Sequence, residues 1–138
     1  MKCALAPSSQ PADQRSALWP LSFAPALDLL LARLSDCGML VLGIVDTTRI
    51  MADAGHEVPE VRQVLAFHPR FMAQVLQVDP AMAVHAPLKF TVIERNGATE
   101  LRCLDPLVAF DAPAPESMAR ELARCVDETL AHPPLPAV

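Results

Sequence analysis

Three side chains that could act together chemically lie at the ends of strand-like segments of this sequence. His68 follows the apolar run 61–67, Lys89 is the second residue of the run 88–95, and Asp105 follows the run 98–104. If these runs form neighbouring antiparallel strands, the end of the first lies beside the start of the second and the end of the third. An imidazole, an ammonium and a carboxylate would then gather at one end of a sheet, with His85 in the preceding loop. Such a set suits general acid–base catalysis or the binding of an anion.

Each of these residues also has an ordinary structural explanation. Asp105 precedes Pro106 and can cap a turn. Lys89 can lie along the end of a sheet with its charged group in water. His68 precedes Pro69 and can simply begin a helix. The structural explanation is our default, and a role of the three residues in catalysis or binding stays open beside it.

Histidines and cysteines give a weaker signal for metals. His68 and His85 are weak candidate ligands, and His56 is a third imidazole, but no pair has the spacing of a metal motif. The sequence therefore predicts no metal site, and it leaves the cofactor unknown. Four cysteines lie far apart without a C-x-x-C pair, which in a cytosolic chain predicts four free thiols. They are Cys3, Cys37, Cys103 and Cys125.

Composition excludes several classes of partner. The net charge is −5, aromatic residues make up 4% and tyrosine is absent, so the chain lacks the basic and stacking surfaces that nucleic acids require. No apolar run reaches the roughly 20 residues that span a bilayer. The N-terminus lacks the apolar stretch of a secretory signal. We expect a cytoplasmic protein that binds neither nucleic acid nor membrane.

The chain divides into one domain and two tails. Residues 1–15 are rich in Pro, Ser, Gln and Ala without periodicity, which predicts a flexible N-terminal tail. Residues 133–138 contain prolines that stop a helix and are expected to form a flexible C-terminal tail. Residues 16–132 are then a single domain, of a size that buries a core of its own.

Within this domain, strand-like and helix-like segments alternate. The strongest signal is Asn96-Gly97 between two alternating runs, which predicts a hairpin with a type I′ turn and positive φ at both residues. The pattern predicts an α+β fold with helices on one face of an antiparallel sheet of about five strands. The expected elements are an edge strand 16–23, a helix 25–37, a buried strand 39–45, a short helix to Ala54, a strand 61–67, a helix from Pro69, the hairpin strands 88–95 and 98–104, and a helix from Pro115 to Leu130.

The order of several short motifs points to a known family. The chain reads C-G-M-L-V-L-G-I-V-D from Cys37, V-L-A-F-H-P across His68, P-L-K before Phe90, and L-D-P at Asp105. This order resembles the Domain of Unknown Function 302 family, a bacterial-type domain, over residues 16–130. The resemblance implies the order strand, helix, four strands, helix with short extra helices, similar to the repeat of the TATA-binding protein. It also implies a homodimer.

Two hypotheses for function follow. The first is an uncharacterised binding or interaction module, a cytoplasmic dimer that holds a small ligand at one end of its sheet. The alternative is a small enzyme, or a metal- or haem-linked redox protein, that uses His68, Lys89 and Asp105. A concave pocket with these three side chains converging on it would favour the alternative.

Overall fold

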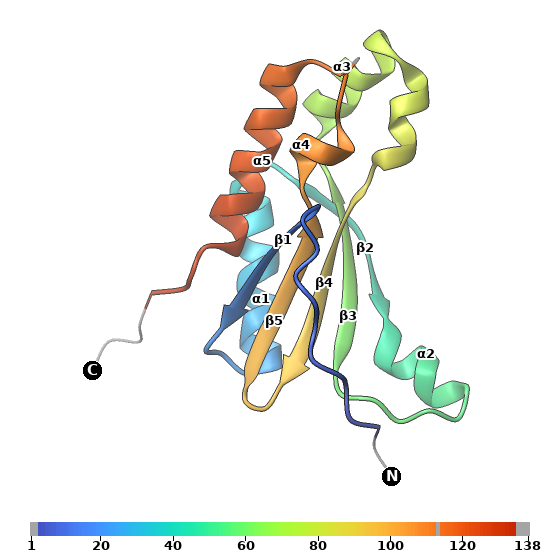
Figure 1. Ribbon diagram of the computed structural model, residues 1–138, viewed down its shortest axis with the longest axis vertical. Coiled ribbons are helices and arrows are strands. Elements are labelled where there is room, and N and C mark those ends of the chain that lie inside the picture. The colour runs from blue at the N-terminus through green and yellow to red at the C-terminus, as the bar shows by residue number, and fades with distance from the viewer. Residues whose placement is uncertain (1–2, 113, 135–138) are drawn as a thin grey trace.

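The computed structural model describes residues 3–112 and 114–134 of the chain. Five strands, five α-helices and one 3₁₀ helix occupy this part of the sequence (Figure 1). The elements are β1 (Gln14–Trp19), α1 (Phe23–Asp36), β2 (Leu40–Asp46), α2 (Thr47–Asp53), β3 (Val61–Phe67), α3 (Pro69–Val78), η1 (Pro80–His85), β4 (Leu88–Arg95), β5 (Ala98–Leu104), α4 (Pro106–Ala109) and α5 (Glu116–Leu130).

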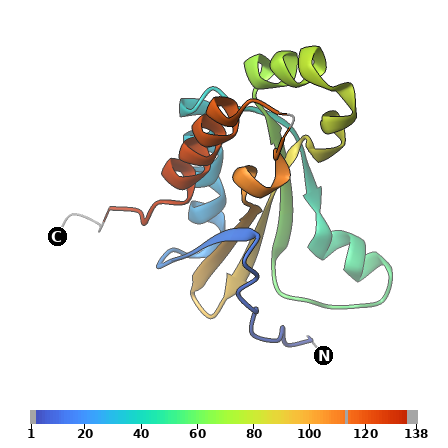
Figure 2. The ribbon, with the colours of Figure 1, turned by 45° about the horizontal axis from the view of Figure 1, so that its top comes forward.

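The strands form one antiparallel sheet in the order β1-β5-β4-β3-β2. The long helices α1 and α5 cover one face of this sheet, and α3, η1 and α4 gather at one end of it (Figure 2). We call the face away from α1 and α5 the open face. The predicted α+β architecture, with helices on one side of a five-stranded sheet, is confirmed.

Alternation along the strands explains the two layers. Phe90 and Val92 of β4 and Leu101 of β5 point to the helix side and are fully buried. They meet an apolar stripe of α5 that recurs every three to four residues. The inward residues of this stripe are Met118, Leu122, Val126 and Leu130.

The hairpin between β4 and β5 has the predicted turn. Arg95 pairs with Ala98, so only two residues form the loop. Asn96 has a φ of 42° and Gly97 a φ of 82°, the left-handed conformations that a type I′ turn requires.

The first strand differs from its predicted bounds. Its predicted span, 16–23, was wrong at both ends, because β1 begins at Gln14 and ends at Trp19, before Pro20. A proline cannot donate to the ladder, so pairing stops in front of it. The prediction that this strand lies at an edge is confirmed.

The prediction of a buried strand at 39–45 was also wrong. Its counterpart β2 is the other edge of the sheet, and Leu40, Leu42 and Ile44 are 51%, 54% and 43% exposed. A continuous apolar run indicates that a strand avoids water, but it does not say what covers that strand. The segment 80–85, expected as a loop, forms the 3₁₀ helix η1.

The N-terminal segment, residues 3–13, crosses the open face (Figure 1). The Arg95 side chain donates to the carbonyl oxygen of Ala6 at 2.9 Å, and the Ser8 hydroxyl donates to Glu100 at 2.6 Å. The Cys3 amide donates to the carbonyl oxygen of Glu57 at 2.7 Å. Of the tail expected at 133–138, residues 135–138 lie outside the described residues.

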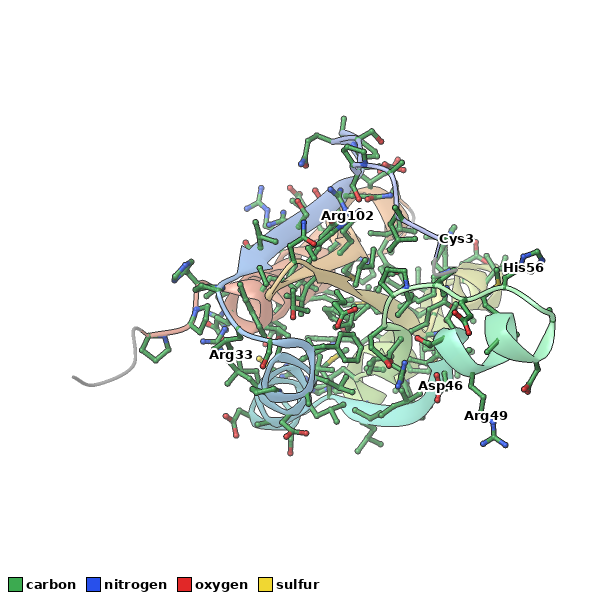
Figure 3. All side chains as sticks on the ribbon, turned by 90° about the horizontal axis from the view of Figure 1, so that it is seen from below. Cys3, Arg33, Asp46, Arg49, His56 and Arg102 are labelled. Atoms are coloured by element: carbon green, nitrogen blue, oxygen red, sulfur yellow. The ribbon has the colours of Figure 1, made fainter. Side chains whose placement is uncertain are left out.

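The opposite end of the sheet carries α2. Asp46 ends β2 and caps this helix by accepting from the Arg49 amide at 3.1 Å (Figure 3). Asp46 therefore lies at the end of the sheet away from His68. Within the described residues, none of the helices combines the length and apolar character that crossing a membrane demands.

Candidate functional site: a groove at one end of the open face

A groove of about 610 Å³ lies on the open face, at the end that carries η1. Strands β3, β4 and β5 form its floor, the start of β1 adds Gln14, and η1 forms one wall. Its volume falls within the range of about 300–1,000 Å³ that is common for sites of small ligands.

The polar side of the groove is formed mainly by cations. Lys89 is exposed in the groove and makes no hydrogen bond or ion pair within the described part of the chain. Arg102 of β5 pairs with Thr91, which is two residues after Lys89 on β4, so the Arg102 side chain lies on the same face as Lys89. His85, the last residue of η1, adds an imidazole to the wall. An ammonium without a partner beside an arginine is suited to bind an anion.

Part of the groove lining is apolar and comes from β3, β5 and η1. Leu65 of β3 pairs with Lys89 and therefore lies beside it on the same face. Val84 and Leu104 also line the groove, and they are 81% and 50% exposed. Aliphatic side chains exposed in a concave surface can bury the apolar part of a ligand.

Arg102 is held in place by a network on the same face. Its Nε donates to Glu100 at 2.7 Å and its Nη1 donates to Gln14 at 3.2 Å. Arg95 donates to the other Glu100 oxygen at 3.2 Å. Two arginines share one carboxylate, so this cluster carries a net positive charge beside Lys89, on a chain whose net charge is −5.

Glu100 is more buried than strand alternation predicts. It is 9% exposed because the N-terminal segment covers it. Burial raises the pKa of the carboxyl, but the hydrogen bond from Ser8 and the ion pair with Arg102 outweigh burial and hold the pKa below its ordinary value.

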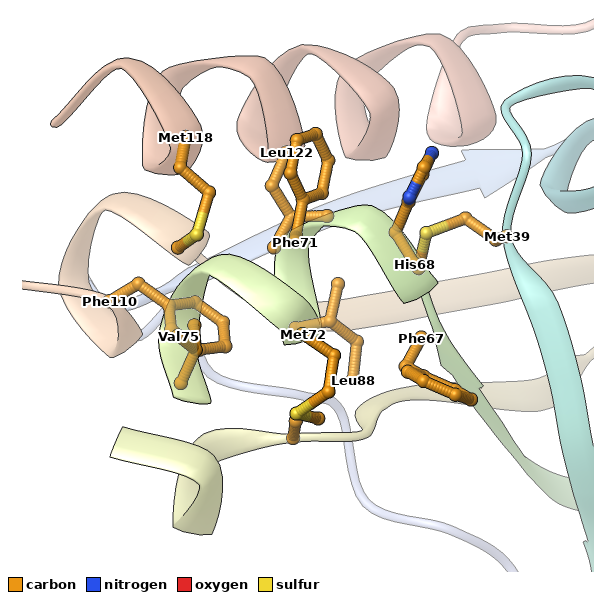
Figure 4. Close-up of a pocket in the computed structure, with 11 residues that line it drawn as sticks. Met39, Phe67, His68, Phe71, Met72, Val75, Leu88, Phe110, Met118 and Leu122 are labelled. Atoms are coloured by element: carbon orange, nitrogen blue, oxygen red, sulfur yellow. The ribbon is translucent and has the colours of Figure 1, made fainter. Parts of the chain in front are cut away.

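His68 lies elsewhere, on the helix-covered side. It lines a small apolar cavity of about 20 Å³ between α3 and α5, which is room for one water molecule (Figure 4). Its Nδ1 accepts from the Arg70 amide at 3.3 Å and so caps α3. The centre of its ring lies 4.5 Å from that of Phe71, with the two ring planes tilted by 40°. A Cβ on Gly38 would lie 3.0 Å from Nε2, so the turn after α1 closes the other side.

The surroundings of His68 favour its neutral form. Burial lowers the pKa of His68, the neighbouring Arg70 lowers it further, and Glu121 opposes both. Neither Lys89 nor Asp105 contributes. This imidazole serves as a helix cap within an apolar contact.

Asp105 is bound to a different set of groups. Its carboxylate accepts from the Leu107 amide at 3.0 Å, which caps α4, and lies 3.1 Å from Arg15 Nε. Arg15 also pairs with Asp127 of α5. The end of β5 is thereby joined to β1 and α5.

The structure does not bring the three predicted side chains together. The expected strand order was right, but neighbouring residues on a strand point to opposite faces. Lys89 pairs with Leu65 on the open face, whereas His68 continues the parity of the buried Ala66. Of the residues singled out from the sequence, Lys89 and His85 line the groove.

Sequence reasoning missed Arg102 and Gln14 as members of this site. The pairing of β1 with β5 places Gln14 opposite Leu104 and so brings it to the groove. Because β1 and β5 are far apart in the sequence, their register is not apparent from local pattern. Among the described residues, no group of three or more His, Cys, Asp or Glu side chains could hold a metal ion, and all four cysteines are free thiols.

The comparisons with known proteins agree with this fold. The profile of the family described as "Domain of unknown function DUF302" matches residues 16–132. The chain belongs to this family. A solved structure, described as the crystal structure of an uncharacterized conserved protein DUF302 from Bacillus stearothermophilus, is similar with a TM-score of 0.78 and 18% identity. The match covers 87% of this chain and 97% of that chain, and it supports the fold alone. No curated protein matches this DUF302 chain.

Proposed function

We propose that this DUF302 protein is a cytoplasmic binding module that holds a small anionic ligand with an aliphatic part. The single observation that carries this proposal is the groove of about 610 Å³ in which Lys89 has no partner within residues 3–112 and 114–134. The anionic group would contact the Lys89 ammonium and the Arg102 guanidinium. The aliphatic part would lie against Leu65 and Leu104. A carboxylate with an alkyl chain has this chemistry.

The electrostatics support an anion rather than a cation. Lys89 has no carboxylate partner among the residues that the structure describes, so an incoming anion does not compete with an ion pair there for its charge. Arg102 is already fixed by Glu100 and Gln14, so little side-chain entropy is lost when it contacts a ligand.

The alternative, a small enzyme or a metal- or haem-linked redox protein using His68, Lys89 and Asp105, has less support. His68 caps α3 and Asp105 pairs with Arg15, on the side of the sheet away from the groove. The groove does contain the imidazole of His85, but none of the residues that line it carries a carboxylate, and the thiol-bearing Cys103 is only 2% exposed.

A thermal-shift series with three probes tests the binding proposal. Octanoate carries both the charge and the alkyl chain, acetate carries only the charge, and 1-octanol carries only the chain. We expect octanoate at tenfold its dissociation constant to raise Tm by roughly 5 °C. Acetate and 1-octanol should raise Tm much less at the same concentration.

Two variants locate the bound anion. Lys89→Met keeps the length of the side chain and removes its charge, and it should remove most of the octanoate shift. Arg49→Met is the matched control, because Arg49 is an exposed cation on α2 at the far end of the sheet (Figure 3). An equal octanoate shift in Lys89→Met and wild type would contradict the proposal, as would an equal response to 1-octanol.

We also propose a homodimer formed through β2. This strand is an edge whose Leu40, Leu42 and Ile44 side chains are about half exposed. An exposed apolar edge presents unpaired backbone groups and readily pairs with another strand. Antiparallel pairing of β2 with the same strand of a second copy would be a twofold contact, the commonest symmetry of small oligomers.

Light scattering at micromolar concentration tests the dimer. We expect a mass twice the 14.9 kDa of one chain. Leu42→Lys should shift the mass toward the monomer, because a charged edge disfavours pairing. Leu76→Lys is the control, since Leu76 is 50% exposed on α3, away from β2. A wild-type mass of 14.9 kDa would contradict the dimer.

A further inference from the structure

Two thiols that are far apart in the sequence meet on the helix-covered side of the sheet. Cys37 is the C-cap of α1, and Cys125 lies in the middle of α5. The Cys37 sulfur is 3.7 Å from the backbone oxygen of Cys125, which places the two cysteines next to each other. Both residues are partly exposed, so a small reagent can reach them.

The groups around this pair disfavour the charged thiolate form of Cys125. Glu128 Oε2 lies 3.7 Å from the Cys37 sulfur, and Thr129 Oγ1 lies 3.9 Å from it. The pKa of Cys125 is raised to about 11, mainly by burial, with the Cys37 thiol and Glu128 acting in the same direction. Arg124 alone opposes this trend, and it also pairs with Glu128.

We propose that Cys37 and Cys125 are a redox modification site, at which a low-molecular-weight disulfide such as oxidised glutathione converts the two thiols into a disulfide between α1 and α5. The uncharged product suits these surroundings better than two thiolates do. The two sulfurs must approach to a bond length of about 2.05 Å. Cys37 lies at a helix end rather than inside a helix, where a small rearrangement is least costly.

The chemistry is two successive thiol–disulfide exchanges. The Cys37 thiolate attacks one sulfur of the oxidised reagent, which forms a mixed disulfide and releases one reagent thiolate. The Cys125 thiolate then attacks the Cys37 sulfur, forms the Cys37–Cys125 bond and releases the second reagent thiolate. The two protein thiols lose two electrons and two protons, and the reagent takes up both as two thiols.

The other two cysteines are poor competitors within the chain. Cys103 is 2% exposed, and burial raises its pKa to about 12. Cys3 is exposed in the N-terminal segment on the open face, on the other side of the sheet from α5. Cys3→Ser is therefore a suitable background for the test, because it removes the exposed thiol that could form disulfides between molecules.

The test treats the Cys3→Ser protein with oxidised glutathione and counts thiols in denaturant. We expect the count to fall from three to one, and peptide mapping to find a Cys37–Cys125 link within one chain. We also expect Tm to rise by more than about 5 °C on oxidation, because the link joins segments distant in sequence. Dithiothreitol should reverse both changes.

Single variants in the same background separate the two steps. Cys125→Ser removes the resolving thiol, so mass spectrometry should find one glutathione retained on Cys37. Cys37→Ser should form no internal link. A count that stays at three, or a link that involves Cys103, would overturn the proposal. Because both substitutions replace sulfur by oxygen alone, far-ultraviolet circular dichroism should confirm that each variant folds.

Discussion

Arg15 Nε lies 3.1 Å from Asp105 Oδ1, and this ion pair ties the start of β1 to the end of β5. Both side chains are mostly buried, at 25% and 19% exposure, and Arg15 also reaches Asp127 of α5. Asp105 additionally caps α4. This carboxylate, which the sequence singled out for chemistry, uses its Oδ1 to hold the sheet end and two helices together.

The first prediction concerns stability at this position. Asp105→Ala should lower the free energy of unfolding by about 1–2 kcal/mol, because it removes a helix cap and an ion pair that is shielded from water. Lys89→Met should change it by less than about 0.5 kcal/mol, since Lys89 is exposed and has no partner in the described part of the chain. Urea denaturation measures both. Equal effects of the two substitutions would contradict the assigned roles.

The second prediction concerns the hairpin. Gly97→Val should destabilise the protein by more than about 1 kcal/mol, because a β-branched residue resists a φ of 82°. Gly43→Val is the matched control. A Cβ at either glycine meets no atom within 4 Å, but only Gly97 has a positive φ. The control should be neutral in a thermal melt, and a neutral Gly97→Val would mean that the turn tolerates another conformation.

The third prediction concerns the titration of His68. Arg70→Gln should raise the His68 pKa toward its ordinary value, because the Arg70 guanidinium is one of the two causes that lower it. Lys89→Met should leave the titration unchanged, because Lys89 lies on the opposite face. NMR of the imidazole protons measures both. An upward shift in Lys89→Met would place the ammonium near the imidazole after all.

The fourth prediction concerns acid stability. The folded-state pKa of Glu100 lies below its ordinary value of 4.5, so the unfolded chain binds this proton first as the pH falls. The stabilising effect of the Glu100 carboxylate is therefore complete above about pH 5 and is lost below the ordinary value. Glu100→Gln should be less stable than wild type at pH 7, and the difference should shrink toward pH 3. A difference independent of pH would contradict the network with Ser8 and Arg102.

The sequence by itself determined the local elements and their two faces. Val61–Phe67, Leu88–Arg95 and Ala98–Leu104 were predicted with the bounds that the structure has. Asn96-Gly97 specifies its turn through backbone conformation, which two residues decide alone. The inward stripe of α5 follows from helical periodicity. These features depend on neighbours in the sequence, so a local pattern is sufficient to predict them.

Tertiary structure decided which residues meet. The sequence placed His68, Lys89 and Asp105 at one end of the sheet, but the pleat sends Lys89 to the open face and His68 under the helices. It also gave no sign that β2 would be an edge, that Ser8 would cover Glu100, or that Cys37 would meet Cys125. Each of these relations joins segments distant in the chain. They depend on strand register and helix packing, which arise only when the whole chain is in place.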